Sequence, residues 1–137
     1  MTKERYLVDS DFLISWFRGI EQAEELALKI GRQNMVCSVV TYLEIAPFEF
    51  AKDARASKTV RAIFKDIEIL GVTPDMGVKG ARAAGAAMKQ NRRFGLPDLQ
   101  IAATADALNL VLVTANIAHF GFYGGLKLLD WRTGTTP

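Results

Sequence analysis

Short apolar runs alternate with segments of helical spacing along this chain, and that alternation is the feature that most limits its fold. Five runs have the length and composition of buried strands: Tyr6–Val8, Met35–Cys37, Ile67–Val72, Val111–Val113 and Leu126–Leu129. The run at Leu126–Leu129 is predicted to be an edge strand. Strands that alternate with helices predict a layered α/β fold with a mostly parallel sheet of four to five short strands.

Helix-starting and helix-ending residues mark the segments between these runs. Gly31 is expected to end a helix over Glu21–Ile30, and Thr73 is expected to cap a helix that has Pro74 in its first turn. The remaining expected helices begin near Phe12, after Ser38, within Lys52–Ile69 and at Leu99–Leu108. Pro47 is expected to bend or end the helix that follows Ser38, because proline has no N–H for a helical hydrogen bond.

The size and charge of the chain exclude several classes of protein. Its 137 residues suit a single domain over 1–137, and 17 basic against 15 acidic residues give a charge of only +2. A single cysteine and a single histidine leave no disulfide and no Cys/His zinc cluster. The charged start and the absence of any run near the ~18 apolar residues of a membrane span predict a cytoplasmic protein with no membrane segment.

Polar side chains stand just beyond the apolar segments. Asp9 follows Tyr6–Val8, Glu44 follows Met35–Val40, Asp98 follows a turn, and Thr114 and Asn116 follow the run that ends at Val113. The carboxyl ends of parallel strands meet at one edge of a sheet, so these groups are expected to converge there. Carboxylates packed together repel unless a cation compensates, and Mg²⁺ or Mn²⁺ with oxygen ligands suits phosphodiester hydrolysis.

Four ordered pieces of the sequence carry a resemblance to a known family. They are Tyr6–Ile14, Val39–Glu44, Asp98–Ala105 and Leu112–Asn116. Together they resemble the PIN-domain ribonucleases, and among these the toxins of VapBC-type toxin–antitoxin pairs. The resemblance covers nearly the whole chain and implies a three-layer α/β/α fold.

The resemblance also implies roles for individual residues. Asp9, Glu44 and Asp98 would form the acidic catalytic core, with Asn116 as the fourth catalytic position and Asp9 and Asp98 as the metal ligands. The hydroxyl of Ser10 would support the metal or its water. Family behaviour implies an endoribonuclease that depends on Mg²⁺ (or Mn²⁺), acts on RNA, forms a homodimer and is inhibited by a cognate VapB-like antitoxin.

Four residues depart from the family pattern. Asp11 stands where Asn is frequent, Ala115 replaces a frequent Arg, and His119 lies where an Asp before Phe is usual. Pro47 is unusual within the helix that carries Glu44.

Structural explanations compete with the functional ones for several residues. Asp9, Asp11 and Asp98 are also good helix-capping or first-turn residues, and for Asp11 capping is the favoured interpretation. Asn116 suits an ordinary turn, His119 suits a structural place beside two phenylalanines, and Cys37 suits the core. Other side chains leave two interpretations open. Arg92 and Arg93 are either a solvated helix end or phosphate contacts, and Phe48, Phe50, Val60 and Phe64 are either core or a groove for an antitoxin helix.

Two other functions remain open from the sequence. Asp9 and Asp11 have the spacing of the nucleophile and acid of a haloacid-dehalogenase-like phosphatase, in which Thr114 would bind phosphate. The chain would instead be a catalytically weakened PIN-like module that binds RNA or a partner if its fourth position fails.

Overall fold

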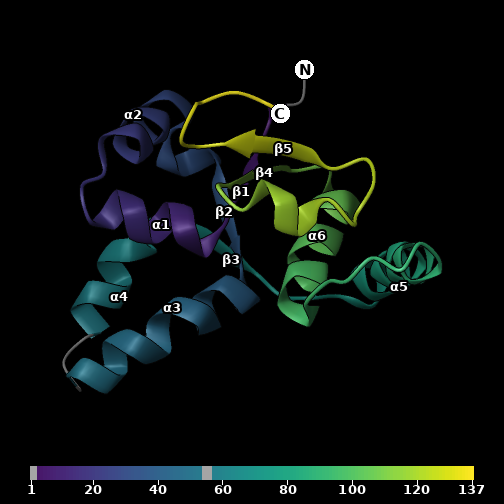
Figure 1. The fold of residues 1–137 in the computed structure, drawn as a ribbon. Coiled ribbons are helices and arrows are strands. Elements are labelled where there is room, and N and C mark those ends of the chain that lie inside the picture. The colour runs from purple at the N-terminus through teal and green to yellow at the C-terminus, as the bar shows by residue number, and fades with distance from the viewer. Residues whose placement is uncertain (1–2, 54–56) are drawn as a thin grey trace.

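A central sheet of five parallel strands organises the molecule (Figure 1). The computed structural model of the protein describes residues 3–53 and 57–137. The strands are β1 (Tyr6–Val8), β2 (Met35–Ser38), β3 (Glu68–Leu70), β4 (Val111–Thr114) and β5 (Lys127–Asp130). Their order across the sheet is β3-β2-β1-β4-β5, and each neighbouring pair is parallel. The predicted α/β class is confirmed, β5 is an edge strand as expected, and the sheet is more uniformly parallel than the sequence indicated.

In the part of the chain that the structure describes, six α-helices connect and cover these strands. They are α1 (Ser10–Phe17), α2 (Glu21–Ile30), α3 (Val39–Lys52), α4 (Ser57–Ile63), α5 (Pro74–Lys89) and α6 (Leu96–Leu108), with short 3₁₀ helices η1 (Arg32–Asn34) and η2 (Ile117–Phe120). Gly31 ends α2 with φ of +80°, a conformation that glycine adopts without strain. Within 3–53 and 57–137, no helix has the length and apolar character needed to cross a membrane.

The helix starts follow the predicted caps. The Ser38 hydroxyl accepts a hydrogen bond from Val40 N–H at 3.1 Å, and the Thr73 hydroxyl accepts one from Met76 N–H at 3.4 Å. Residues 54–56 of the expected helical segment lie outside the described residues, and α4 occupies the part that follows. The caps thus fix where each helix leaves the sheet.

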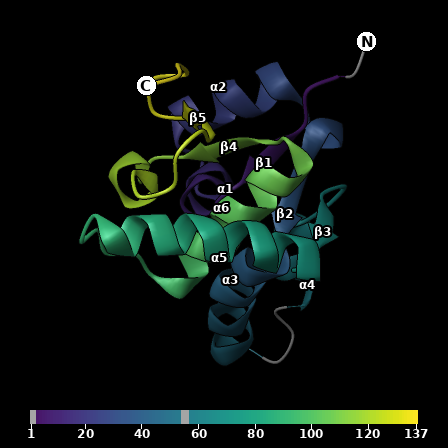
Figure 2. The ribbon, with the colours of Figure 1, turned by 90° about the vertical axis from the view of Figure 1, so that its right-hand side faces the viewer.

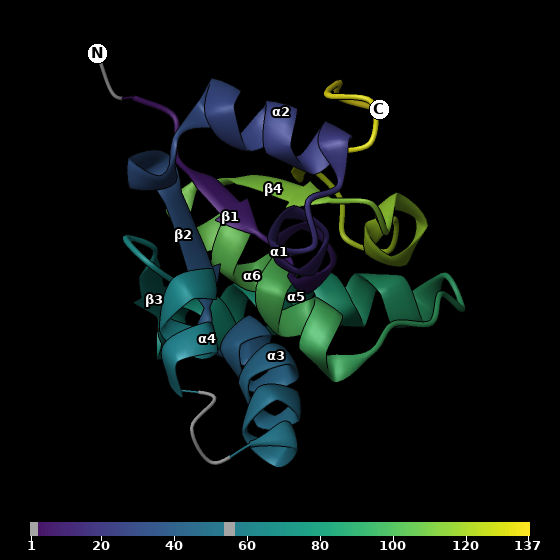
Figure 3. The ribbon, with the colours of Figure 1, turned by 90° about the vertical axis from the view of Figure 1, so that its left-hand side faces the viewer.

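Pro47 does not end α3, which continues to Lys52. The helix was expected to bend or end at this residue, and of these two outcomes the end is contradicted. Proline removes the hydrogen bond to the carbonyl four residues earlier, on Leu43, but Leu43 and Pro47 both lie on the exposed side of the helix. Water can therefore solvate that carbonyl, and α3 remains long enough to project beyond the sheet (Figure 3).

Each face of the sheet is covered by its own group of helices. Figure 3 shows α1 to α4 on one side, and Figure 2 shows α5 and α6 on the other. Successive strand residues point to opposite faces, so Val8 and Val113 pack with α1 to α4 whereas Leu7 and Leu112 pack with α5 and α6. Burial on both faces explains why the strands are apolar at nearly every position.

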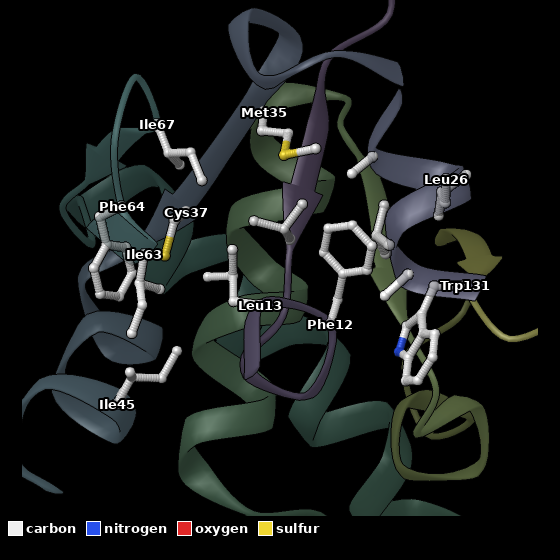
Figure 4. Close-up of a cluster of buried hydrophobic side chains, with 14 of the residues drawn as sticks. Phe12, Leu13, Leu26, Met35, Cys37, Ile45, Ile63, Phe64, Ile67 and Trp131 are labelled. Carbon is white, nitrogen blue, oxygen red and sulfur yellow. The ribbon is translucent and has the colours of Figure 1, made fainter. Parts of the chain in front are cut away.

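The first of these two cores is built around α1 (Figure 4). Phe12 and Leu13, both completely or almost completely buried, pack with Met35 and Cys37 of β2, and the ring of Trp131 lies beside Phe12 with centroids 6.4 Å apart. The apolar run Phe12–Phe17 is therefore largely core, while Phe17 at its end is exposed. Burial of Phe12 holds the start of α1 against the sheet, directly after Asp9.

On the opposite face, α5 and α6 pack closely through small residues. A Cβ placed on Gly80 of α5 would lie 3.1 Å from the Cβ of Ala103 on α6, so the two backbones approach as the alanine-rich sequence predicts. Gly80, rather than Gly85 in the middle of the helix, makes this approach. Close packing fixes the position of α6 and of Asp98 in its first turn.

The connections between strands run outward from β1 to both sides of the sheet, and this determines where the candidate site lies. The chain moves from β1 to β2 and β3 on one side, then crosses to β4 and β5 on the other. In open parallel sheets a crevice forms at such a switch point, outside the carboxyl ends of the strands. Val8 pairs with Val113, and Asp9 N–H extends this pairing by donating to the Val113 carbonyl at 3.0 Å. Asp9 and Thr114 therefore emerge side by side.

Candidate active site

Asp9 is the centre of the candidate site. Its side chain is only 5% exposed, and both carboxylate oxygens accept hydrogen bonds. Oδ1 accepts from Ser10 N–H at 2.8 Å, and Oδ2 accepts from the Thr114 hydroxyl at 2.9 Å. Asp9 caps α1 and is also fixed to β4, so the capping interpretation and the site interpretation hold together.

Burial raises the pKa of Asp9 to about 7. Desolvation is the largest cause, followed by the negative charge of Asp11, and Glu44 adds a smaller effect in the same direction. The hydrogen bonds from Ser10 and Thr114 oppose the rise. A carboxylate held in this way favours a compensating cation nearby.

Asp11 also belongs to the acidic group, which sequence reasoning did not expect. Its Oδ2 accepts a hydrogen bond from Ala115 N–H at 2.7 Å, while its Oδ1 is buried without a hydrogen-bond partner. Trp131 Nε1 is also buried without a partner in good hydrogen-bond geometry, although it lies close enough to Asp11 to lower the pKa of that carboxyl. Burial has the larger effect and raises this pKa.

Only the fold could show this place for Asp11. The signal in the sequence is its position two residues after Asp9, at the start of a helix, which is equally typical of a cap. Its partner Ala115 lies 104 positions along the chain. The positive charge of Arg132 lowers the pKa of Asp11. Arg132 and its neighbour Trp131 follow β5, and no local sequence pattern at either residue points to the site.

Glu44 lies on α3, near enough to other carboxylates for their charges to act on it. Partial burial raises the pKa of Glu44, and the charges of Asp98 and Asp11 raise it further. Its effect on the pKa of Asp9 has the same sign. The structure therefore brings Glu44 into electrostatic contact with the three aspartates, as the sequence placed it for Asp9 and Asp98.

Asp98 lies in the first turn of α6, where the helix dipole favours a negative charge. Burial raises the pKa of Asp98, and the nearby His119 lowers it. Asp98 Oδ2 lies 3.9 Å from His119 Nδ1, and both side chains line a surface hollow of about 340 Å³ together with Arg93 and Gly95. The predicted structural place for His119 beside Phe120 and Phe122 is thus incomplete, because its ring faces a carboxylate.

Asn116 and Ser10 contact residues of the candidate site with their backbone N–H groups. Asn116 N–H donates to the Thr114 hydroxyl oxygen at 3.0 Å, but its side chain is exposed and does not cap η2. Ser10 supports Asp9 through its N–H. Catalytic roles for the Asn116 amide and the Ser10 hydroxyl stay predictions.

The donor set fits a hard divalent ion held largely by water. Within residues 3–53 and 57–137, no three Asp, Glu, His or Cys side chains lie close enough together to hold a metal ion jointly. Mg²⁺ in proteins is commonly bound through one or two carboxylates and keeps several waters. The mutual rise in pKa among these carboxyls indicates a place where positive charge is favoured.

The structure also shows the places of Cys37, Arg92, Phe48 and Phe64, for which the sequence left two roles open. Cys37 is buried and its pKa rises to about 12, mainly through desolvation, which fits the predicted core role. Arg92 is not merely solvated, since its guanidinium donates to the Gly121 carbonyl. Phe48 is 71% exposed, whereas Phe64 is buried against the first core.

The sequence is similar to a known domain family and to known proteins. The PIN domain family matches residues 6–120. Ribonuclease VapC10 of Mycobacterium tuberculosis (strain H37Rv) is 35% identical over 126 residues, which cover 88% of this chain and 90% of the relative. Ribonuclease VapC1 of Haemophilus influenzae (strain R2866) is 25% identical over 130 residues, covering 92% and 97%.

Structure comparison finds the same fold. The toxin–antitoxin pair VapBC from Salmonella typhimurium, solved bound to DNA, contains a chain that superposes with a TM-score of 0.82 at 20% identity, covering 94% of this chain and 99% of the other. VapBC-1 from nontypeable Haemophilus influenzae gives a TM-score of 0.78 at 25% identity, covering 93% and 98%.

Proposed function

This chain belongs to the PIN-domain family, and from that premise we propose that it is a metal-dependent endoribonuclease that hydrolyses RNA phosphodiester bonds as the toxin of a toxin–antitoxin pair. The observation that carries the proposal is the environment of Asp9. It is buried, held by Ser10 and Thr114, and surrounded by the charges of Asp11 and Glu44. Relatives named ribonucleases support the reaction class.

In this proposal Asp9 and Asp98 hold a Mg²⁺ or Mn²⁺ ion. When bound, such an ion stabilises negative charge on the phosphate and lowers the pKa of a bound water. Thr114 and Ser10 keep the Asp9 carboxylate in one orientation, so little reorganisation is needed when the ion and phosphate arrive. Asp98 is positioned separately, by the packing of α6 against α5.

Glu44 orients the attacking water and accepts its proton. The water oxygen forms a bond to phosphorus while one of its protons passes to the Glu44 carboxylate, and the bond from phosphorus to the leaving oxygen breaks. That oxygen then takes a proton from solvent. A raised pKa makes Glu44 a better base near neutral pH than an unperturbed glutamate, which supports this role.

Cationic and amide groups at the rim would contact the RNA backbone. Arg93 lines the hollow that contains Asp98, and a guanidinium binds phosphate oxygens well. Asn116 is exposed next to Thr114, where its amide can donate to a phosphate. These contacts would position the strand without reading its sequence.

The proposal also includes binding partners, an oligomeric state and a cellular compartment. Solved relatives are complexes of VapBC and of FitAB, which supports a cognate VapB-like antitoxin, and the exposed rings of Phe48 and Phe50 on α3 offer it an apolar surface. We also propose that the protein forms a homodimer. We further propose a single PIN-like domain over 1–137, which the one sheet formed by β1 to β5 supports. A reaction on RNA, and a free Cys37, fit the cytoplasm.

The phosphatase alternative does not fit the described site. It requires Asp11 to be free to exchange a proton with a substrate, but Oδ2 of Asp11 is bound to Ala115 N–H and burial surrounds Oδ1. One observation supports the alternative of a catalytically weakened module: the side chain of Asn116, the predicted fourth catalytic position, is exposed. A cleavage assay separates that module from an active nuclease.

The test is cleavage of tRNA, rRNA and mRNA by the full chain with Mg²⁺ or Mn²⁺, before and after chelation. Asp98→Asn should lose at least about a hundredfold in rate, the scale expected when a group that stabilises transition-state charge is removed. The matched control is Asp75→Asn, the same change in the first turn of α5, which should keep its activity. Full activity of Asp98→Asn, or of the chelated protein, would contradict the proposal.

A further inference from the structure

His119 is placed as if to share a ligand with Asp98. The two side chains face each other across the hollow described above, with 3.9 Å between Nδ1 and Oδ2. That separation exceeds a hydrogen bond. The His119 ring is 65% exposed and the Asp98 carboxyl 32%, so both can be reached from solvent.

The distance suits one ion in contact with both atoms. Imidazole nitrogens and carboxylate oxygens lie about 2.1 Å from small divalent metals, so two such atoms can share an ion when they are up to about 4.2 Å apart. That limit applies to ligands on opposite sides of the ion. Ligands at octahedral or tetrahedral angles lie about 3.0 to 3.4 Å apart, so this pair, at 3.9 Å, must close by less than about 1 Å. Neither side chain needs to move far to meet a common ion.

The backbone around His119 is held in place. Its N–H donates to the Asn116 carbonyl at 3.0 Å, the next residue, Phe120, is 1% exposed, and the Gly121 carbonyl accepts from Arg92. These contacts fix the Cα position of His119 relative to Asp98, so only the imidazole has to reorient to meet an ion.

The chemistry of the donors gives the preference. Mg²⁺ favours oxygen ligands, whereas imidazole favours the first-row transition metals, whose affinity for nitrogen sites exceeds that of Mg²⁺. Arg93 in the same hollow is cationic and suits the phosphate that the ion would hold. We propose that His119 is a ligand of the ion bound by Asp98, and that its imidazole makes the site prefer a transition-metal ion, with Mn²⁺ as the probe, over Mg²⁺. This inference rests on the proposed function.

The chain allows a direct test because His119 is its only histidine. Electron spin echo spectra of Mn²⁺ bound to the untagged full chain should show couplings to an imidazole nitrogen, which can come only from this residue. Arg93→Gln, which changes the charge of the hollow but removes no imidazole, should keep the couplings. His119→Ala should lose them while its circular dichroism spectrum stays unchanged.

Calorimetry gives a second readout. His119→Ala should lower Mn²⁺ affinity by about ten- to a hundredfold and leave Mg²⁺ affinity nearly unchanged, while His119→Asp should raise the affinity for Mg²⁺ relative to Mn²⁺. Mn²⁺ bound without nitrogen couplings would overturn the role of His119 and leave the proposed nuclease intact. Absence of Mn²⁺ binding by the folded protein would overturn both.

Discussion

The two edges of the sheet differ in size and in chemistry. At the amino ends of β1, β4 and β5 lies a cavity of about 610 Å³ between α2, the strands and the C-terminal residues. The hollow at the carboxyl edge, beside Asp98, is about 340 Å³. The larger space is lined mainly by apolar side chains such as Leu26 and Ile30, whereas the carboxyl edge holds Asp9, Asp11, Glu44 and Asp98, and burial raises the pKa of each.

This difference shows that strand direction, rather than the volume of a space, locates the chemistry in this fold. Polar residues that end parallel strands all appear at the same edge, where Asp9 and Thr114 are joined by a hydrogen bond. The amino edge offers room but only scattered charges, Glu4, Lys29 and Lys127. Removing one carboxylate at each edge, in Asp9→Asn and Glu4→Gln, tests the comparison directly.

Asp9→Asn should have the largest effect. We expect RNA cleavage to fall about a thousandfold or more, equivalent to about 4 kcal/mol of transition-state stabilisation, because the amide cannot supply a charged ligand. Single-turnover cleavage rates at saturating Mn²⁺ measure it. Glu4→Gln should cleave at the rate of the unmodified protein, and equal losses in the two variants would remove the distinction between the edges.

The pH dependence of stability should come next. Asp9 has a folded-state pKa of about 7, above its ordinary value of 3.8, so the folded protein binds this proton more tightly than the unfolded chain does. The stability that this provides is fully present below about pH 4 and is lost as the pH rises to about 7, by up to about 4 kcal/mol. Urea unfolding of chelator-treated protein at several pH values measures the loss.

Substitution shows whether that slope belongs to the carboxyl edge. Asp9→Asn should flatten much of the decline, and Glu4→Gln should leave it unchanged. Added Mn²⁺ should restore stability at pH 7 in the unmodified protein, since binding to the folded state alone stabilises it. A pH dependence between pH 4 and pH 7 that is the same in Asp9→Asn and in the unmodified metal-free protein would contradict the raised pKa of Asp9.

Glu44→Gln should have a smaller effect on catalysis than Asp9→Asn. We expect kcat to fall about a hundredfold, the usual contribution of a general base, with little change in thermal stability because the Glu44 side chain is only partly buried and reaches solvent. Glu49→Gln on the same helix is the control, since Glu49 pairs with Lys52 at 3.3 Å rather than with the site. Similar kinetics in the two variants would remove Glu44 from the mechanism.

Changes at the amino edge should have the smallest effect. Lys127→Gln alters the charge of the larger cavity, yet cleavage should change less than about twofold because this edge contributes no group to the reaction. The same cleavage assay measures it. A large loss of activity with unchanged stability would show that the amino edge takes part in function after all.

Much of this arrangement could be predicted from local sequence. The strand at Tyr6–Val8, the caps Ser38 and Thr73, and the turn before Asp98 are local signals, and each lies where expected. Strand ends in a parallel sheet share an edge, so the meeting of Asp9 with Thr114 could also be foreseen, whereas Glu44 and Asp98 reach the same edge from α3 and α6. Their catalytic roles remain predictions.

The features that escaped prediction depend on partners remote in sequence or on solvent. Asp11 looked like a cap because its partner Ala115 directly follows β4, more than a hundred positions later. Pro47 looked like a helix end because the sequence does not say which side of α3 faces water. The approach of Trp131 to Asp11 required the register of β5, whose pairing is set only when β4 is in place.

The pairing of β1 with β4 also controls when the protein can act. Asp9 is synthesised before Thr114, which orients it and lies 105 positions later. The central strand must wait for most of the chain before its neighbour arrives, so a nascent or truncated polypeptide has no assembled site. With the proposed activity against RNA, a cell would thus be spared cleavage by unfinished copies during translation.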